Sequence, residues 1–373
     1  MHTRTRPDDT RSAIVVRGWT GQLSAAELAR LASEGQRPRT PYVELARALD
    51  ADVIDADYLE RRARAVPRAL GRQLDIVEGQ VLEAFFDRRR YRHVVAWADR
   101  IGVELALLFK IARSRRDLVL VSNWLMGPSK RRFLGLGVQS HLGTIIGYGS
   151  VQLELAAEKY SLPREKLHVA LQPVDERFWQ PQEEASESLI CSVGCISGFR
   201  DYQTLVAAVR ELPVRAELAV GSLILSADRR EQRAEIFRTA IPPNELPPNV
   251  SYQLDMPPTA LRELYARSRF VVMPLEDVDF DAGVTSITEA MAMGKAVIVT
   301  RNRGQVDVVR DNVDGLYVPP RDPRALREAI EHLLTNPDEA RRMGAAGRQA
   351  VLDRHRLDDY TARVASIIRA ASE

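Results

Sequence analysis

The stretch Asp281–Thr300 reads DAGVTSITEAMAMGKAVIVT, and its pattern predicts a short loop, a helix and a buried strand. The loop ends in Gly283, and the apolar run Ala296–Thr300 follows the helix. The N-terminus of a helix presents backbone N–H groups and a positive dipole end, which suit a phosphate or a diphosphate. The alternative is that Thr285 or Ser286 serves only as the N-cap of this helix, so the segment alone leaves both interpretations open.

Two carboxylates flank this loop, Asp281 before the helix and Glu289 about one turn inside it, with D-x7-E spacing. This spacing lets both side chains face the same side of the predicted phosphate site. Carboxylates accept hydrogen bonds from the hydroxyl groups of a sugar or a ribose. Glu289 is followed by the apolar residues Ala290–Ala292, where a charge without a partner is unfavourable. We therefore expect Asp281 and Glu289 to bind a ligand.

Short apolar runs alternate with amphipathic stretches along the whole chain, and the alternation predicts an α/β fold with parallel sheets covered by helices. The predicted strands are Ala13–Val16, Ala51–Ile54, His93–Trp97, Leu118–Val121, Thr144–Gly147, Leu189–Val193, Glu217–Val220, Val250–Gln253, Phe270–Met273, Ala296–Thr300 and Leu316–Val318. The predicted helices are Ser24–Ser33, Tyr42–Leu49, Val77–Phe86, Val103–Ala112, Val151–Tyr160, Gln203–Leu212, Thr259–Ser268, Ser286–Met293, Pro323–Leu334, Pro337–Leu352 and Asp358–Ala371.

The pattern restarts after a polar, turn-like stretch at Phe178–Ser188, and a chain of 373 residues is too long for one ordinary core. We therefore predict two Rossmann-like domains. The first spans residues 1–181. The second spans residues 182–355 and carries the phosphate site.

The quoted stretch resembles the donor-site signature of retaining, nucleotide-sugar-dependent glycosyltransferases with the GT-B fold, the sucrose-synthase and mannosyltransferase-like family four. That family carries two acidic residues at E-x7-E spacing, followed by EAMA-x-G-x-P-V. This chain has Asp281 and then EAMAMGKAV at Glu289–Val297. The resemblance extends to other segments: Val174-Asp175, Phe178, Pro181, NVDGL at Asn312–Leu316, Val318–Pro320, Asp322-Pro323 and MGAAGR at Met343–Arg348.

The resemblance implies that the two domains face a central cleft and that a C-terminal helix, residues 356–373, crosses back to the first domain. It also implies a role for each matching residue. Asp281 would contact the donor sugar and Glu289 the ribose, while amides of Gly283, Val284, Thr285 and Ser286 would bind the diphosphate.

The same resemblance covers the loop Gly194–Asp201, where the family carries two phosphate-binding cations. Arg200 matches the second cation, and Gly194 and Ser197 belong to the same binding loop. Cys195 stands where the family has its first cation. Position 281 also departs from the family, because it has Asp in place of Glu. The two departures leave open how fast this site turns over and which donor sugar it selects.

The first half offers weaker candidates for an acceptor site. Gly18 lies in a glycine turn after the first predicted strand, and Trp97 and Asp99 end the third, where ligands of parallel sheets bind. Asn123 and His141 are alternatives for the histidine that the family places near the donor sugar. The competing interpretations are an ordinary turn for Gly18 and a structural role for His141.

Charge is unevenly distributed: residues 1–181 hold 29 Lys+Arg and 22 Asp+Glu, 29 − 22 = +7, which leaves −5 for the rest of a chain whose net charge is +2. The basic segments Phe85–Arg92 and Lys130–Phe133 include aromatics and fit either a solvated face or a lipid surface. A peripheral membrane contact is therefore one expectation, and no nucleic-acid motif accompanies these segments.

Cys191 and Cys195 lack the further ligands that a zinc site needs, so we expect no metal. We find no apolar run of membrane-spanning length and no secretory signal, and we expect a cytoplasmic location.

We therefore expect an enzyme that moves a hexosyl group from a nucleotide-diphosphate sugar to an acceptor hydroxyl with retention of configuration and without a cofactor. The acceptor class, whether saccharide, lipid or small metabolite, stays open. The alternatives are a non-catalytic, nucleotide-binding GT-B partner subunit and a nucleotide-sugar 2-epimerase with the same fold.

Overall fold

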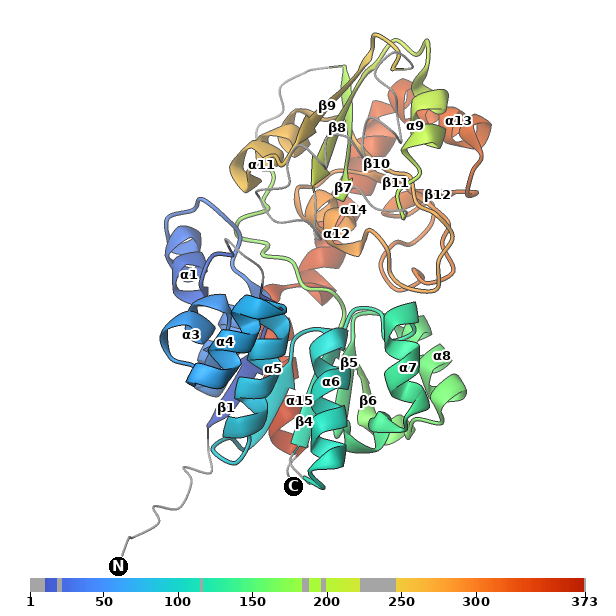
Figure 1. Cartoon of the computed structure of the whole chain (residues 1–373). Helices are drawn as coiled ribbons and strands as arrows, with labels where there is room; N and C mark the ends of the chain where they lie inside the picture. Colours follow the sequence, from blue (N-terminus) through green and yellow to red (C-terminus); the bar gives the residue numbers. More distant parts are fainter. Residues whose placement is uncertain are drawn as a thin grey trace, which may run out of the picture. The chain divides into compact units, whose positions relative to one another are not determined.

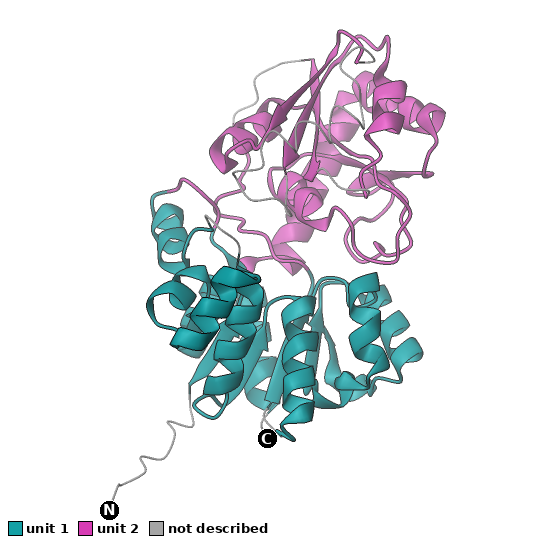
Figure 2. Cartoon of the chain, viewed as in Figure 1, with its two compact units in different colours: residues 1–34, 39–171, 358–373 teal, residues 35–38, 172–357 magenta. Residues whose placement is uncertain are grey.

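The computed structural model describes residues 11–18, 22–114, 117–182, 188–195, 199–221 and 246–371. Contacts divide the chain into two compact units (Figure 2). Unit 1 contains residues 1–34, 39–171 and 358–373, and unit 2 contains residues 35–38 and 172–357. Each unit contains one six-stranded parallel sheet with helices packed on it, as the sequence predicted (Figure 1).

The strands of unit 1 lie in the order β2-β1-β3-β4-β5-β6. They are β1 (Ser12–Val15), β2 (Asp52–Ile54), β3 (His93–Ala96), β4 (Asp117–Ser122), β5 (Thr144–Gly147) and β6 (Leu167–Val169). The helices of this unit are α1 (Ala25–Ser33), α2 (Pro41–Leu49), α3 (Ala56–Arg61), α4 (Ala65–Gln73), α5 (Ile76–Asp87), α6 (Asp99–Ile111), α7 (Pro128–Gly135), α8 (Ser150–Tyr160) and α15 (Leu357–Ala370), with short 3-10 turns η1 (Val138–His141) and η2 (Arg164–Lys166).

Both faces of the unit 1 sheet are buried, because alternate residues of each strand point to opposite sides. On β4, Leu118 and Leu120 pack with the core that includes α5 and α6. The intervening residues Val119 and Val121 pack into the opposite core. Helix α15 contributes to that second core through four buried side chains, Tyr360, Val364, Ala365 and Ile368.

The strands of unit 2 lie in the order β12-β11-β10-β7-β8-β9. They are β7 (Leu189–Cys195), β8 (Arg215–Gly221), β9 (Val250–Leu254), β10 (Val271–Met273), β11 (Val297–Thr300) and β12 (Gly315–Val318). The described helices are α9 (Tyr202–Val209), α11 (Pro258–Arg267), α12 (Val284–Ala292), α13 (Pro323–Thr335) and α14 (Pro337–Arg354). Val271 and Met273 face one core and Val272 faces the other, so this sheet is also covered on both sides.

Every strand and helix predicted from the sequence is confirmed, with bounds that shift by a few residues. The prediction missed β6 and the helices α3, α4 and α7. Helix α7 was missed because Leu134 is its only buried side chain, so its sequence carries too few core positions for a helical pattern.

The division between the units differs from the predicted boundary at residues 181–182. Phe178 and Trp179 pack into a unit 2 core, and the ring of Trp179 meets that of Tyr265 edge-on at 5.6 Å. These aromatic contacts place residues 172–181 with unit 2.

Apart from the short segment 35–38, the chain enters unit 2 near Gln172 and leaves it near Leu357, and these two segments are bonded to each other. Val174 N donates to His355 O (2.9 Å), and the ring Nδ1 of His355 lies 2.9 Å from Gln172 O. Leu357 N lies 3.4 Å from a carboxylate oxygen of Glu176. The entrance and the exit of unit 2 therefore lie side by side.

Candidate functional site

The sheet of unit 2 reverses its strand order between β7 and β10. From β7 the chain continues outward through β8 and β9, whereas β10, β11 and β12 extend in the other direction. Ligands of open parallel sheets bind outside the carboxyl ends of the strands at such a reversal. Here Gly194 and Cys195 end β7, and Leu275 follows β10.

The segment after β7 is fixed to the segment after β10 by backbone contacts. Arg200 forms an antiparallel bridge with Leu275. On either side of it, Asp201 N donates to Pro274 O (3.1 Å) and Glu276 N donates to Phe199 O (3.2 Å). These bonds hold Arg200 at the strand-order reversal.

The guanidinium group of Arg200 lies against two glycines. A Cβ on Gly194 would come within 2.1 Å of Arg200 Nε, and a Cβ on Gly283 would come within 3.2 Å of an Arg200 terminal nitrogen. The Nε is buried and has no hydrogen-bond partner among the described residues. A cation with an unused donor therefore lies next to the residue that begins α12.

Helix α12 begins without a side-chain cap. Its N-cap is Gly283, whose φ of 80° lies in the left-handed region that glycine tolerates best, and no side chain caps the helix. The alternative in which Thr285 or Ser286 is the N-cap is therefore wrong. Thr285 is exposed, whereas Val284 and Ser286 are buried. An uncapped helix N-terminus beside a cation favours an anion such as a diphosphate.

Asp281 and Glu289 lie at the two ends of this short loop-and-helix segment. Asp281 is 8% exposed. The phenol of Tyr265 donates to a carboxylate oxygen of Glu289 (3.2 Å) and also lies 3.3 Å from Ser286 O. Burial raises the pKa of Glu289 to about 8, and the bond from Tyr265 offsets only part of this shift. Glu289 is therefore mostly protonated at neutral pH.

The loop before α12 is supported by the segment after β11. Asn302 donates from its side-chain nitrogen to Glu276 O (3.1 Å), and Gln305 donates to Ala282 O (3.2 Å). Gly304 packs so closely that an added Cβ would lie 2.2 Å from the backbone nitrogen of Phe280. These contacts fix the path of the backbone that carries Asp281.

The remaining donor-side predictions concern the loop after β7. Cys191 and Cys195 are both free thiols. Cys191 is buried, and burial raises the pKa of its thiol to about 12, whereas Cys195 at the end of the strand is half-buried. Ser197 lies outside the described residues.

Three acceptor-side candidates follow neighbouring strands of unit 1. Gly18 follows β1, Trp97 follows β3 and Asn123 follows β4, so all three lie at the carboxyl edge of the sheet. Gly18 N donates to the buried side chain of Gln80 (3.0 Å), and the ring of Trp97 meets that of Tyr42 edge-on at 6.2 Å. The side chain of Asn123 is exposed.

Asp99 has a structural role that the sequence did not predict. Its carboxylate accepts from Ser122 Oγ (2.5 Å), Asn123 N (3.2 Å) and Trp124 N (2.9 Å). The side chain is buried, so it holds the loop after β4 rather than facing a ligand. It can act on an acceptor only through Asn123 and its neighbours.

His141 lies at the opposite edge of the sheet. It ends the turn η1 just before β5 begins at Thr144. Its ring Nδ1 lies 2.9 Å from Ser140 Oγ, and burial together with Lys110 and Lys166 lowers its pKa. The structure thus separates His141 from Gly18, Trp97 and Asn123.

Comparison with known proteins agrees with this geometry. Residues 174–350 match the family described as glycosyl transferases group 1. The chain is 27% identical over 214 residues to alpha-maltose-1-phosphate synthase of Mycolicibacterium smegmatis, covering 52% of this chain and 54% of that relative. The chain thus spans about half the length of this relative.

Two solved structures share the fold of the whole chain. Sucrose-phosphate synthase from Thermosynechococcus elongatus superimposes with a TM-score of 0.71 at 18% identity, covering 97% of this chain and 98% of that one. Anabaena Alr3699/HepE, solved in complex with UDP-glucose, has a TM-score of 0.69 at 15% identity, with 96% and 99% covered.

The two units therefore have the GT-B fold that these solved structures share. The match to the group 1 glycosyl transferases covers just under half of the chain. In the part of the chain that the structure describes, no helix is long and apolar enough to cross a membrane.

Proposed function

We propose that this protein transfers a hexosyl group from a nucleotide-diphosphate sugar to an acceptor hydroxyl with retention of configuration. The observation that carries this proposal is the half-buried Arg200, with its buried Nε, beside the uncapped N-terminus of α12. Asp281 and Glu289 add hydroxyl-binding groups at the same segment. The complex of Anabaena HepE with UDP-glucose supports a donor of this class.

In this mechanism the bond between the anomeric carbon and the diphosphate oxygen breaks, and negative charge develops on the diphosphate. Arg200 and the first amides of α12 stabilise that charge, which lowers the barrier in a site that is already organised. The acceptor oxygen bonds to the anomeric carbon from the same face, and its proton passes to the leaving diphosphate. No protein nucleophile takes part.

Asp281 would accept hydrogen bonds from the hydroxyls of the donor sugar. Glu289 would contact the ribose, and in its neutral form it can both donate and accept a hydrogen bond. Gly194, Gly283, Val284, Thr285 and Ser286 would line the diphosphate. The acceptor, whether saccharide, lipid or small metabolite, would meet the edge of unit 1 that carries Gly18, Trp97 and Asn123.

A turnover assay tests this proposal. The protein is incubated with a panel of UDP-, GDP- and ADP-sugars, with and without acceptors, and released nucleoside diphosphate is measured. We expect release with at least one donor, and nuclear magnetic resonance of the product should show the donor's anomeric configuration. Nucleotide binding without any release would favour the non-catalytic partner subunit, and a 2-epimer of the donor would favour the epimerase.

Three variants connect the turnover to Arg200. Arg200→Ala should lower turnover by about two to three orders of magnitude, as the loss of an oxyanion donor does, and Arg200→Lys should restore part of it. Gly194→Ala should also lower it, because the new Cβ would lie 2.1 Å from Arg200 Nε. Gly221→Ala is the matched control at the end of the adjacent strand, where an added Cβ meets nothing within 4 Å.

We also propose a cytoplasmic location, since both cysteines are free.

A further inference from the structure

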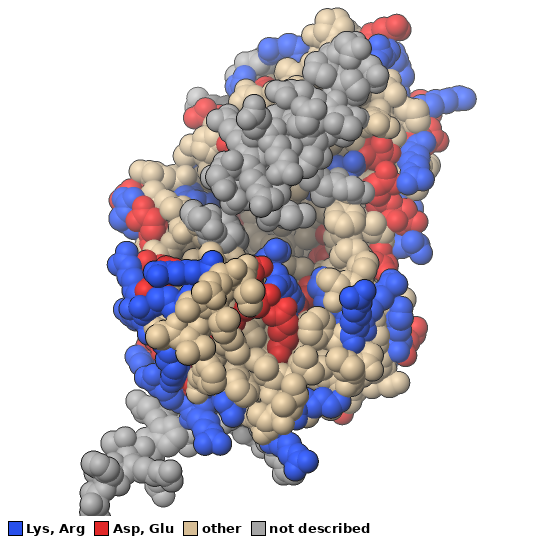
Figure 3. All heavy atoms as spheres, viewed as in Figure 1, with Lys and Arg blue, Asp and Glu red and all other residues tan. Residues whose placement is uncertain are grey.

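Helix α7 carries three consecutive cations that form no ion pair with a carboxylate among the described residues: Lys130, Arg131 and Arg132. Elsewhere in the molecule, exposed arginines pair with acidic neighbours. Examples are Arg72 with Glu60 (2.5 Å) and Arg324 with Glu328 (2.9 Å). Blue side chains gather over the part of unit 1 that carries α7 in the space-filling view (Figures 1 and 3). No carboxylate in the described part of unit 1 therefore pairs with these three cations of α7.

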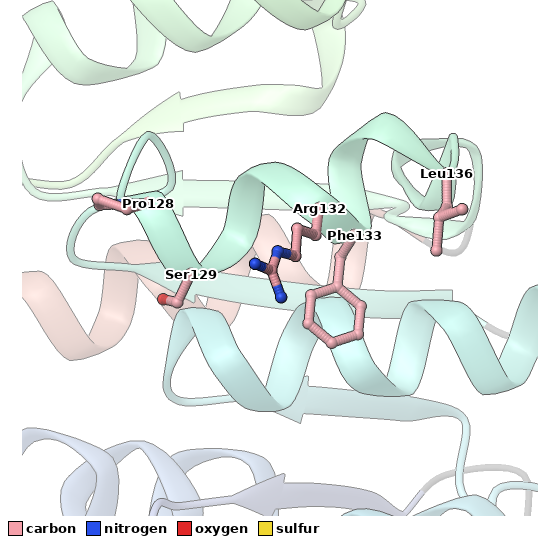
Figure 4. Close-up of a pocket in the computed structure, with 5 residues that line it drawn as sticks. All are labelled: Pro128, Ser129, Arg132, Phe133 and Leu136. Carbon is pink, nitrogen blue, oxygen red and sulfur yellow. The ribbon is translucent and has the colours of Figure 1, made fainter.

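One face of the same helix mixes polar and apolar side chains. Ser129, Arg132, Phe133 and Leu136 follow the i, i+3, i+4, i+7 spacing of that face. Phe133 is half-buried against the unit 1 core, whereas Leu136 is exposed. With Pro128 they line an open hollow of about 590 Å³, and Figure 4 shows their side chains on one side of α7. Leu136 is 59% exposed, which is unusual for a leucine at such a position.

The end of α6 extends this surface. Lys110 Nζ donates to Leu136 O (2.5 Å) and to Gly137 O (3.1 Å), so the C-terminal ends of α6 and α7 meet. Ile111, the last residue of α6, is 71% exposed. At the start of α7, Lys130 Nζ lies 5.7 Å from the ring centroid of Trp124.

We propose that this surface, formed by Ile111, Lys130, Arg131, Arg132 and Leu136 and here called the α7 surface, binds membranes that contain anionic lipids. The cations attract the negatively charged headgroups, and the exposed aliphatic side chains enter the headgroup–acyl boundary. A nucleic acid would satisfy the cations but would leave Ile111 and Leu136 without an apolar partner. A lipid surface satisfies both kinds of side chain at once.

The orientation of α7 connects this surface to the candidate acceptor edge. Helix α7 follows β4, so its first residues lie near the carboxyl edge that carries Asn123. The buried carboxylate of Asp99 bonds to Asn123 N and Trp124 N, which fixes the segment leading into α7. Lys130, near the start of α7, would therefore lie toward the residues proposed to meet the acceptor, whereas Ile111 and Leu136 would lie toward the opposite edge of the sheet.

Vesicle binding tests the proposal without relying on transferase activity. The whole protein is mixed with vesicles of phosphatidylcholine alone and of phosphatidylcholine with phosphatidylglycerol, and the bound fraction is measured by sedimentation. We expect binding to the mixed vesicles only, and the binding should weaken as salt is added. Equal binding to both vesicle types, or to neither, would overturn the proposal.

Variants locate the contact. The triple variant Lys130→Ala, Arg131→Ala, Arg132→Ala should lower partitioning roughly a hundredfold, from a loss of roughly fivefold per cation. The double variant Ile111→Ser, Leu136→Ser keeps the charge and should also weaken binding. The control Arg324→Ala, Arg327→Ala, Arg341→Ala removes the same charge from exposed, ion-paired positions of unit 2 and should bind as the wild type does.

Two results would count against the α7 surface. One is unchanged partitioning of the triple variant. The other is equal loss in the unit 2 control, which would indicate that overall charge alone decides binding. Melting curves of each variant confirm that it is folded. A failed turnover assay would leave the vesicle result unaffected, so the two proposals fail separately.

Discussion

Glu289 illustrates at the scale of a single residue how the site depends on a contact that no motif encodes. The carboxyl group lies one helical turn inside α12, and its described hydrogen-bond partner is the phenol of Tyr265 on α11. Tyr265 is fully buried and packs against Trp179. Because burial disfavours the charged form, the pKa of Glu289 rises to about 8.

The raised pKa predicts how Glu289 affects stability as pH changes. The folded protein keeps this proton up to about pH 8, whereas an unfolded chain loses it near 4.5, the ordinary pKa of a glutamate. Its contribution to stability is therefore complete below pH 4.5 and is lost as pH rises through 8. Glu289→Gln imitates the neutral carboxyl and cannot lose a proton. We therefore expect the free energy of unfolding of this variant to rise relative to that of the wild type as pH rises, by on the order of 2–4 kcal/mol by pH 9.

Melting temperatures of the nucleotide-free proteins between pH 5 and pH 9 measure this difference. Tyr265→Phe serves as the companion variant, because it removes the bond that lowers the pKa of Glu289. The melting temperature of Tyr265→Phe should therefore fall further below that of the wild type as pH rises. A pH-independent difference for Glu289→Gln would show that the carboxyl is charged throughout. The same Gln variant should bind nucleotide more weakly if Glu289 contacts the ribose.

Some site residues could be predicted from sequence and others could not, for a physical reason. Asp281, Gly283 and Glu289 lie within one loop-and-helix segment, so their spacing alone indicates that they belong together. Tyr265 lies 24 positions before Glu289 and has the pattern of an ordinary core residue on an amphipathic helix. The structural role of Asp99 could not be predicted, because its three donors lie more than 20 positions away in the chain.

At the scale of secondary-structure elements, the MGAAGR stretch Met343–Arg348 packs α14 against the end of α12. A Cβ on Gly344 would lie 2.0 Å from Gly294 O, so α14 can lie this close to the turn after α12 only with glycine at position 344. Arg348 donates to Trp179 O (2.9 Å) and Ala292 O (2.8 Å), the latter at the C-terminus of α12. The stretch thus supports the helix that carries Glu289.

Gly344→Ala should destabilise the protein despite the better helix propensity of alanine. The clash with Gly294 O should cost about 1–3 kcal/mol, as overpacking of a close contact does. Gly135→Ala in α7 is the matched control, because an added Cβ there meets nothing within 4 Å. We expect that control to be neutral or stabilising by up to about 1 kcal/mol. Urea unfolding of both variants checks the difference, and equal midpoints would contradict the packing argument.

Elements with a clear apolar period were predicted well, and α7 shows where such prediction stops. Leu134 is buried and Phe133 half-buried, whereas Leu136 is exposed, so the segment could not be distinguished from a solvated, basic loop. The β7–β10 pairing was also beyond prediction, since strand order depends on contacts between distant segments.

At the scale of the whole molecule, unit 1 is completed by the last helix of the chain. Tyr360, Val364, Ala365 and Ile368 of α15 lie in the same core as Ile14 of β1 and Val119 of β4. Arg369 adds a bond to Ala48 O (2.6 Å) at the end of α2. The stability of unit 1 therefore depends on residues that follow all of unit 2.

Ile368→Ala should lower the stability of unit 1 by about 2–5 kcal/mol, because it leaves a cavity at a fully buried position. Hydrogen exchange measured by mass spectrometry should show faster exchange in β1 and β4 and little change in β7 and β10. Ser366→Ala, at an exposed position of the same helix, is the control. Equal acceleration in both sheets would mean that the units unfold together.

The adjacent entrance and exit of unit 2 have a consequence for biosynthesis. Apart from residues 35–38, unit 2 is an insertion in unit 1, so its two ends, near Gln172 and Leu357, can pair while the final helix is still being made. A nascent chain folds largely in the order in which its segments emerge. One apolar face of the first sheet, which α1 and α2 cover only in part, is therefore completed only when α15 leaves the ribosome, after all of unit 2 has been made.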